Sequence, residues 1–213
     1  SNFVINSVIF DSNGAVGASA DNGYEGRGGA VAVIESDVTF SDCEFKGNNA
    51  QNGERPGGLS TNASAYGGAV FVYLGNVTFS NSTFSSNTVT KRENGTASGG
   101  AIFAYAPASL TISGCTFEGN TTQNWGGALR AEGGNLVLSN NVFTGNSASE
   151  NGGGVEFNNV ESAAFSECTF SKNTAATGGA IHLSNNSRNI TIEGSVFTEN
   201  EATTLAAGIS VST

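Results

Sequence analysis

Four residues of the types that carry acid–base chemistry recur in the second half of the sequence: Arg130, Glu132, Glu156 and His182. Each follows a pair of glycines by four or six residues, so a repeating fold would place them in one outward column or in two neighbouring ones. Glycoside hydrolysis needs two carboxylates about 5 to 10 Å apart, and Glu132 and Glu156 on adjacent repeats would meet that requirement. The interpretation we favour is a solvated ladder of charges, worth roughly a few tenths of a kcal/mol per pair.

Four aromatic residues occupy the equivalent positions earlier in the chain: Phe71, Tyr73, Phe103 and Tyr105. Facing outward on adjacent repeats, they would form a patch of a kind that is rare on soluble proteins. Trp125 lies just before the next pair of glycines. Two interpretations remain open. The patch is a platform that stacks sugars or docks a protein, or one of the long loops folds over it and buries it.

These side chains are positioned by a repeat that contains two short motifs. One motif is Phe-x-x-Asn, with copies that begin at Phe45, Phe84, Phe117, Phe143, Phe170 and Phe197 and an earlier copy at Phe10. The other is a Gly-Gly step followed by a small and an aliphatic residue, with copies that begin at Gly28, Gly67, Gly99, Gly126, Gly152 and Gly178 and a degenerate copy at Ala206. Ordered recurrence of both motifs predicts a repeat protein.

The spacing of the motifs separates a packed unit from its loops. The Gly-Gly step precedes the next Phe by 17 to 19 residues, whereas the distance from Phe to the next Gly-Gly step ranges from 8 to 22. Surface loops tolerate such variation and cores do not, so we expect long loop insertions at residues 49–66 and 88–98.

The constant segment alternates apolar and polar residues with a period of two, which predicts three short strands per repeat and no helix. A unit of about 26 residues with Gly and Asn at its corners is typical of a coil of a parallel β-helix. We therefore expect an all-β, single-stranded parallel β-helix of six to seven coils in one domain, residues 1–213. Partial coils at 1–27 and 206–213 would flank coils that begin near residues 28, 67, 99, 126, 152 and 178. A leucine-rich repeat is the alternative, but the chain has only 8 Leu and places Phe where that repeat needs Leu.

Stacking of coils turns each repeated position into a column. The Phe column should fill the interior as an aromatic stack. The Asn column should form a ladder of amides at a corner, each bonded to the coils on either side. Its members are Asn48, Asn87, Asn120, Asn146, Asn173 and Asn200.

The three cysteines each lie two residues before the Phe of a coil, so they share one inward column. Cys43, Cys115 and Cys168 fall in alternate coils, about 9.6 Å apart, which exceeds the reach of a disulfide. We predict three buried, reduced thiols that pack as small apolar groups.

The composition limits the partners. Charged residues make up 12% of the sequence and the net charge is -10, so nucleic acid is excluded as a partner because little here neutralises phosphates. No apolar run approaches the roughly 20 residues of a membrane-spanning helix, and direct membrane insertion is not expected. No cofactor or metal is expected either, since the sheet faces carry no cluster of Asp ligands.

The combination of Gly-Gly-Ala-aliphatic and Phe-x-x-Asn resembles the repeats of the chlamydial polymorphic membrane proteins. The matches are GGAV at 28 and 67, GGAI at 99 and 178, GGAL at 126 and GGGV at 152, and they extend over essentially the whole chain. The resemblance implies a right-handed β-helical passenger of an autotransporter, secreted and held at the outer membrane, that acts outside the cell as an adhesin or display surface. Its partner would be a host-cell receptor or a glycan.

We therefore expect a non-enzymatic extracellular segment that serves in adhesion or surface display. Because Met is absent and both ends fall partway through a coil, we expect a piece of a longer protein whose neighbouring coils continue the stack. The alternatives are a structural subunit that associates end to end into a filament or sheath and, less favoured, a pectate-lyase-like carbohydrate-active enzyme.

Overall fold

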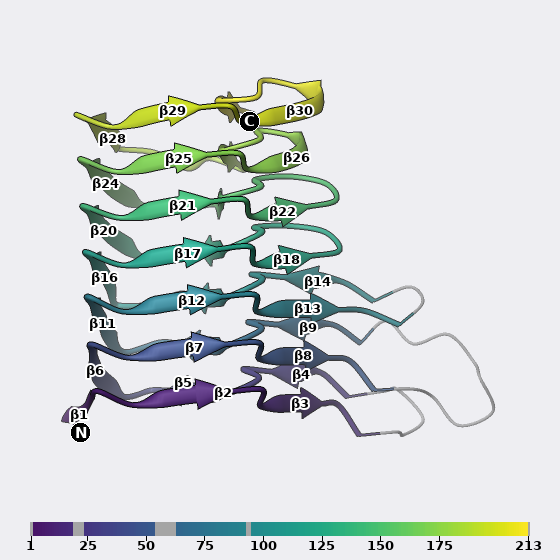
Figure 1. The fold of residues 1–213 in the computed structure, drawn as a ribbon, viewed down its shortest axis with the longest axis vertical. Coiled ribbons are helices and arrows are strands. Elements are labelled where there is room, and N and C mark those ends of the chain that lie inside the picture. Colours follow the sequence, from purple (N-terminus) through teal and green to yellow (C-terminus); the bar gives the residue numbers. More distant parts are fainter. Residues whose placement is uncertain (1, 19–23, 54–62, 93–94, 213) are drawn as a thin grey trace.

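The protein is described by a computed structural model over residues 2–18, 24–53, 63–92 and 95–212. These residues form strands and turns without a helix, so this part of the chain contains no helix able to cross a membrane. Figure 1 shows the chain winding through stacked coils, with the N-terminus and the C-terminus at opposite ends of the long axis. The predicted all-β, parallel β-helical architecture is confirmed.

Four parallel sheets, each of seven strands, run along the stack, and strands pair with their equivalents in adjacent coils. We number the sheets in the order in which the chain meets them after each Gly-Gly step. Sheet I contains β5 (Val31–Ile34), β10 (Val70–Tyr73), β15 (Ile102–Tyr105), β19 (Leu129–Glu132), β23 (Val155–Asn158), β27 (Ile181–Ser184) and β31 (Ile209–Val211). Sheet II contains β1 (Asn2–Asn6), β6 (Asp37–Ser41), β11 (Asn76–Ser80), β16 (Ser109–Ser113), β20 (Asn135–Ser139), β24 (Ser162–Ser166) and β28 (Ile190–Glu193).

Sheet III contains the strands of the Phe column: β2 (Ile9–Asp11), β7 (Glu44–Lys46), β12 (Thr83–Ser85), β17 (Thr116–Glu118), β21 (Val142–Thr144), β25 (Thr169–Ser171) and β29 (Val196–Thr198). Sheet IV follows the Asn column: β3 (Gly14–Val16), β8 (Asn49–Gln51), β13 (Thr88–Thr90), β18 (Thr121–Thr122), β22 (Ser147–Ala148), β26 (Thr174–Thr177) and β30 (Glu201–Leu205). The prediction of three strands per coil is therefore wrong. The inward positions of sheet IV are filled mostly by small residues such as Ala50, Ala148 and Ala175, so its alternation of apolar and polar residues is too weak for a period of two to reveal.

The two predicted insertions begin and end as strands rather than as loops. Residues 49–66 contain β8 and β9 (Ala65–Tyr66), and residues 88–98 contain β13 and β14 (Ala97–Ser98). With β4 (Gly26–Arg27), the strands β9 and β14 form a short parallel sheet, here called the arm sheet. It packs against sheet IV through a small buried cluster of Ala50, Ala65, Val89 and Ala97, at the right in Figure 1. Residues 54–62 and 93–94 of the insertions lie outside the described part of the chain.

The Phe column fills the interior as predicted. From Phe10 to Phe197, neighbouring rings stack with centroids 4.6 to 5.0 Å apart and planes within 9° of parallel. The five rings from Phe45 to Phe170 have no exposed surface. Because each ring contacts the rings above and below it, this column links the packing of every coil to that of its neighbours.

The Asn column is the predicted amide ladder, and its bonding is directional. The backbone N–H and the Nδ2 of Asn87 both donate to Asn120 Oδ1, at 3.0 and 2.9 Å. The same Nδ2 donates to the carbonyl of Phe45 in the preceding coil, at 2.9 Å. The pattern repeats from Asn48 to Asn200, and Asn13 joins it as a further donor to Asn48. The buried side-chain amides are satisfied in this way.

The Gly-Gly step makes the corner between the arm side of the coil and sheet I. Gly67 has a φ of 64°, a conformation that side chains disfavour. Gly68 has no room for a Cβ, because that atom would overlap the carbonyl oxygen of Gly100 in the next coil. The turn is consequently tight, and the residue before it lies close to the residues after it.

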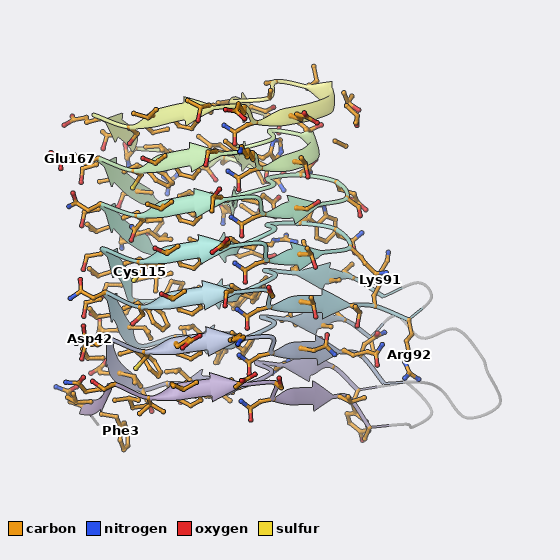
Figure 2. The ribbon with its side chains drawn as sticks, viewed as in Figure 1. Phe3, Asp42, Lys91, Arg92, Cys115 and Glu167 are labelled. Atoms are coloured by element: carbon orange, nitrogen blue, oxygen red, sulfur yellow. The ribbon has the colours of Figure 1, made fainter. Side chains whose placement is uncertain are left out.

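The three cysteines are free and buried, as predicted. Figure 2 shows Cys115 at the corner between β16 and β17. Burial raises the pKa of the Cys115 thiol to about 11 and also raises the pKa of Cys168. Thiols so held are protonated at neutral pH and unsuited to nucleophilic chemistry.

Candidate functional site

The column of candidate residues on sheet I is real, and its register is the predicted one. Phe71 pairs with Phe103, Phe103 with Arg130, Arg130 with Glu156, and Glu156 with His182 on successive strands. The next outward column likewise brings Ile34, Tyr73, Tyr105 and Glu132 into line. We call the first the inner row and the second the outer row.

The inner row is buried, which overturns the expectation that these side chains face solvent. Phe71 and Phe103 are 3% and 2% exposed, so they are no exposed platform. Arg130, Glu156 and His182 are 5%, 3% and 4% exposed, so their column is no solvated ladder. These charged and polar groups are held inside the protein, where each interaction weighs more than at a surface.

The cover comes from residues that directly precede each Gly-Gly step. Tyr66 lies over Phe103, with ring centroids 4.5 Å apart, and the Arg27 guanidinium lies 5.1 Å from the centre of the Phe71 ring. Trp125 covers the Arg130 guanidinium at 4.4 Å. We call the residues that directly precede the Gly-Gly steps the wall. The tight Gly-Gly corner brings the wall onto the inner row. Phe71 and Phe103 are therefore covered, but by Arg27 and Tyr66 on the arm-sheet strands β4 and β9 and not by a long loop folded over the patch.

The outer row remains accessible. Ile34 is 53% exposed and Tyr105 is 46% exposed, while Tyr73 is half-buried. The rings of Tyr73 and Tyr105 lie 5.9 Å apart, with planes 16° from parallel. Of the predicted aromatic site, these two tyrosines are the part that a ligand can reach.

The wall and the two rows enclose a groove of about 470 Å³, within the range of small-ligand sites. It is lined by Glu25, Arg27, Ile34, Tyr66, Phe71, Tyr73, Phe103, Tyr105 and Glu132. The lining is predominantly aromatic with a few charged groups at its margin. Trp125, predicted as part of this face, lies beyond the groove as the cover of Arg130.

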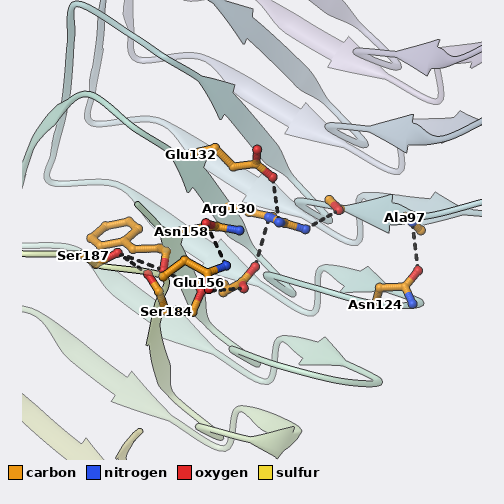
Figure 3. A network of polar contacts seen from close by, with 11 residues as sticks. Ala97, Asn124, Arg130, Glu132, Glu156, Asn158, Ser184 and Ser187 are labelled. Atoms are coloured by element: carbon orange, nitrogen blue, oxygen red, sulfur yellow. Dashed lines mark hydrogen bonds and ion pairs between the residues drawn. The ribbon is translucent and has the colours of Figure 1, made fainter. Parts of the chain in front are cut away.

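Arg130 organises the polar end of the groove (Figure 3). Its Nη2 is 2.6 Å from Glu132 Oε1, and its Nη1 donates to Ser98 Oγ at 2.9 Å. Its Nε lies 3.0 Å from Glu156 Oε2, an ion pair in which the N–H is not aligned for a hydrogen bond. One guanidinium therefore joins both carboxylates of the candidate column to the wall.

The carboxyl of Glu156 has a pKa close to neutral pH. Burial raises its pKa to about 7, against the opposing attraction of Arg130. The like charge of Glu132 adds to the rise in the pKa of Glu156. Ser184 Oγ lies 3.5 Å from Glu156 Oε1. Burial also lowers the pKa of His182, whose Nδ1 has no hydrogen-bond partner in the described part of the chain.

A carboxyl that stays protonated beside an ionised one is the arrangement that glycosidases use for acid–base catalysis. Here, however, Glu156 lies on β23, one coil beyond Glu132, and does not line the groove, and both carboxylates are bound to one arginine. A sugar in the groove would contact Glu132 and the tyrosines. The described residues also contain no group of three His, Cys, Asp or Glu side chains that could hold a metal ion.

Sequence reasoning missed Glu25, Arg27 and Tyr66, which also line the groove. A signal for two of them was present, because Arg27, Tyr66 and Trp125 all stand immediately before a Gly-Gly step. Aligning the repeats on the glycines would have shown this column of large side chains.

Comparison with known proteins agrees with this architecture. No curated protein matches the chain. The family model described as a right-handed β-helix region matches residues 1–213, the whole of the chain. The protein belongs to the right-handed β-helix family.

Proposed function

We propose that this chain is a non-enzymatic segment of an extracellular cell-surface protein and that it acts in adhesion through the groove on sheet I. The observation that carries the proposal is the groove itself, with the half-buried Tyr73 and the exposed Tyr105 side by side on paired strands of sheet I. Aromatic side chains held in place in this manner bind ligands at a small cost in conformational entropy.

The remaining support comes from the sequence. The Gly-Gly-Ala and Phe-x-x-Asn repeats resemble the repeats of bacterial autotransporter passengers, for which a surface location and a host-cell receptor or glycan are expected. The low content of charged residues is compatible with that location. Glu156 is buried and does not line the groove, which favours binding over hydrolysis.

The test compares binding of the purified protein and a Tyr73→Ala, Tyr105→Ala variant to a panel of host-type cells. Phe71 and Phe103 are left unchanged, because truncating a buried Phe costs about 3–5 kcal/mol and would unfold the site. The matched control is Thr111→Ala, Val137→Ala, a pair on adjacent strands of sheet II. We expect cell binding to be lost in the tyrosine variant alone. Equal binding by all three proteins would exclude the groove as the adhesive site.

A further inference from the structure

We propose that the groove binds an uncharged glycan, with the sugar chain lying along the axis of the β-helix across Tyr73 and Tyr105. This inference rests on the proposed function, in that it names the ligand class of the same groove. Three features of the described residues carry it: the pairing of the charges, the spacing of the outer row, and the pairing of the strands β10 and β15 with neighbours on both sides.

The charges that line the groove are already paired. Arg27 is bound to Glu25, and Glu132 is bound to Arg130. The faces of Phe71 and Phe103 carry the guanidinium groups of Arg27 and Arg130, at 5.1 and 5.9 Å from the ring centres. A sulfated or carboxylated glycan would thus meet no uncompensated cation here, and the net charge of -10 would repel it. A cationic ligand would find those ring faces occupied.

Hydroxyl groups suit the site better than charges do. A carboxylate oxygen accepts a hydrogen bond from a sugar hydroxyl even while its other oxygen is bound to arginine. Glu132 and Glu25 line the groove and can take that role, next to tyrosine rings that pack against the apolar faces of pyranoses.

The outer row has the spacing of a polysaccharide. Ile34, Tyr73, Tyr105 and Glu132 stand on four adjacent strands of sheet I. Neighbouring strands are about 4.8 Å apart, close to the length of one ring in an extended β-1,4-linked pyranose chain. Successive sugars would therefore meet successive residues of the row, over about four units.

An extended peptide is disfavoured by the backbone of the floor. β10 pairs with β5 and with β15, and β15 also pairs with β19, so the two strands that carry the tyrosines offer no free edge. Peptides that bind sheets gain much of their affinity from such an edge. A sugar chain needs only the side chains.

The test is calorimetric titration with soluble β-linked glucan, xylan, mannan and N-acetylglucosamine oligomers of increasing length, beside heparin and polygalacturonate. We expect at least one neutral series to bind, with affinity that rises to about four sugar units and then levels. The Tyr73→Ala, Tyr105→Ala variant should bind about tenfold more weakly or worse, and Thr111→Ala, Val137→Ala should bind normally. Raising the salt from about 0.1 to 1 M should leave binding unchanged.

Three results would overturn the inference: no binding by any neutral series, binding that is equal in the tyrosine variant, or preference for the polyanions with loss at high salt. Comparison with the cell assay separates this inference from the proposed function. Tyrosine-dependent cell binding without neutral-glycan binding leaves adhesion standing and rejects the glycan. The reverse result retains the glycan site and rejects adhesion.

Discussion

Replacing Glu156 with Gln should change how the stability of the protein depends on pH. The pKa of this carboxyl is about 7 in the folded protein against an ordinary value of 4.5. Below pH 4.5 the group is protonated whether the chain is folded or unfolded. Between pH 4.5 and 7 the unfolded chain releases the proton and the folded protein retains it, so the free energy of unfolding falls as the pH rises.

The size of this fall follows from the shift in pKa. At about 1.4 kcal/mol for each unit, the wild-type protein should lose about 3 kcal/mol from this group by pH 8. Gln has nearly the shape of the protonated carboxyl and does not titrate. The stability of Glu156→Gln relative to the wild type should therefore rise by about 3 kcal/mol between pH 4.5 and pH 8.

Urea denaturation at several pH values, followed by the fluorescence of Trp125, measures this difference, provided that the two proteins have equal m values. Glu118→Gln, which removes an exposed carboxyl on sheet III, reports the effect of deleting one charge as such. The contribution of His182 is present in both proteins and largely cancels. A relative stability that stays constant, or that falls with rising pH, would refute the reasoning. It would mean that Arg130 holds Glu156 ionised.

Three further predictions concern the ladder, the thiols and the absence of catalysis. Asn120→Ala should cost roughly 3 kcal/mol or more in a denaturation experiment, because it leaves the donors of Asn87 and the carbonyl of Phe84 without partners. The same substitution at an exposed asparagine would lower the free energy of unfolding far less. Without reductant, the denatured protein should titrate three thiols, whereas the folded protein should react slowly even at pH 8, since burial raises the pKa of Cys115 to about 11. A disulfide would contradict the register of the coils. Neither the wild type nor Glu156→Gln should release reducing ends from polysaccharides, and turnover that disappears in the variant would establish an enzyme.

The parts of the fold that could be predicted are those that stacking repeats. Phe117 and Asn120 have equivalents in every coil, so seven copies of a weak motif, counting the one at Phe10, specify one interior stack and one ladder. The alternation of residues within the constant segment was enough to set the register of sheets I, II and III, because a slip by one residue would turn every inward side chain, the Phe rings included, to the outside.

The candidate site was only partly predictable, because burial there depends on the direction of a turn. A period of two correctly places Phe71 and Arg130 on the outer side of sheet I, but it does not reveal what lies against that side. The cover consists of Tyr66 and Trp125, which the Gly-Gly corner brings back onto the sheet. The charged column was interpreted as solvated for the same reason.

The stacking of whole coils also determines how the molecule would respond to a pulling force. The hydrogen bonds between coils, including those of the ladder from Asn13 to Asn200, run along the long axis. Tension between the two ends acts in line with these bonds and loads the outermost coil first, so the coils should detach one after another. Each detached coil frees 26 to 39 residues, the longer ones carrying the insertions, and lengthens the chain by roughly 90 to 140 Å. A protein built in this way would yield stepwise under tension and dissipate the load, which force spectroscopy would record as a sawtooth with longer steps for the coils that carry insertions.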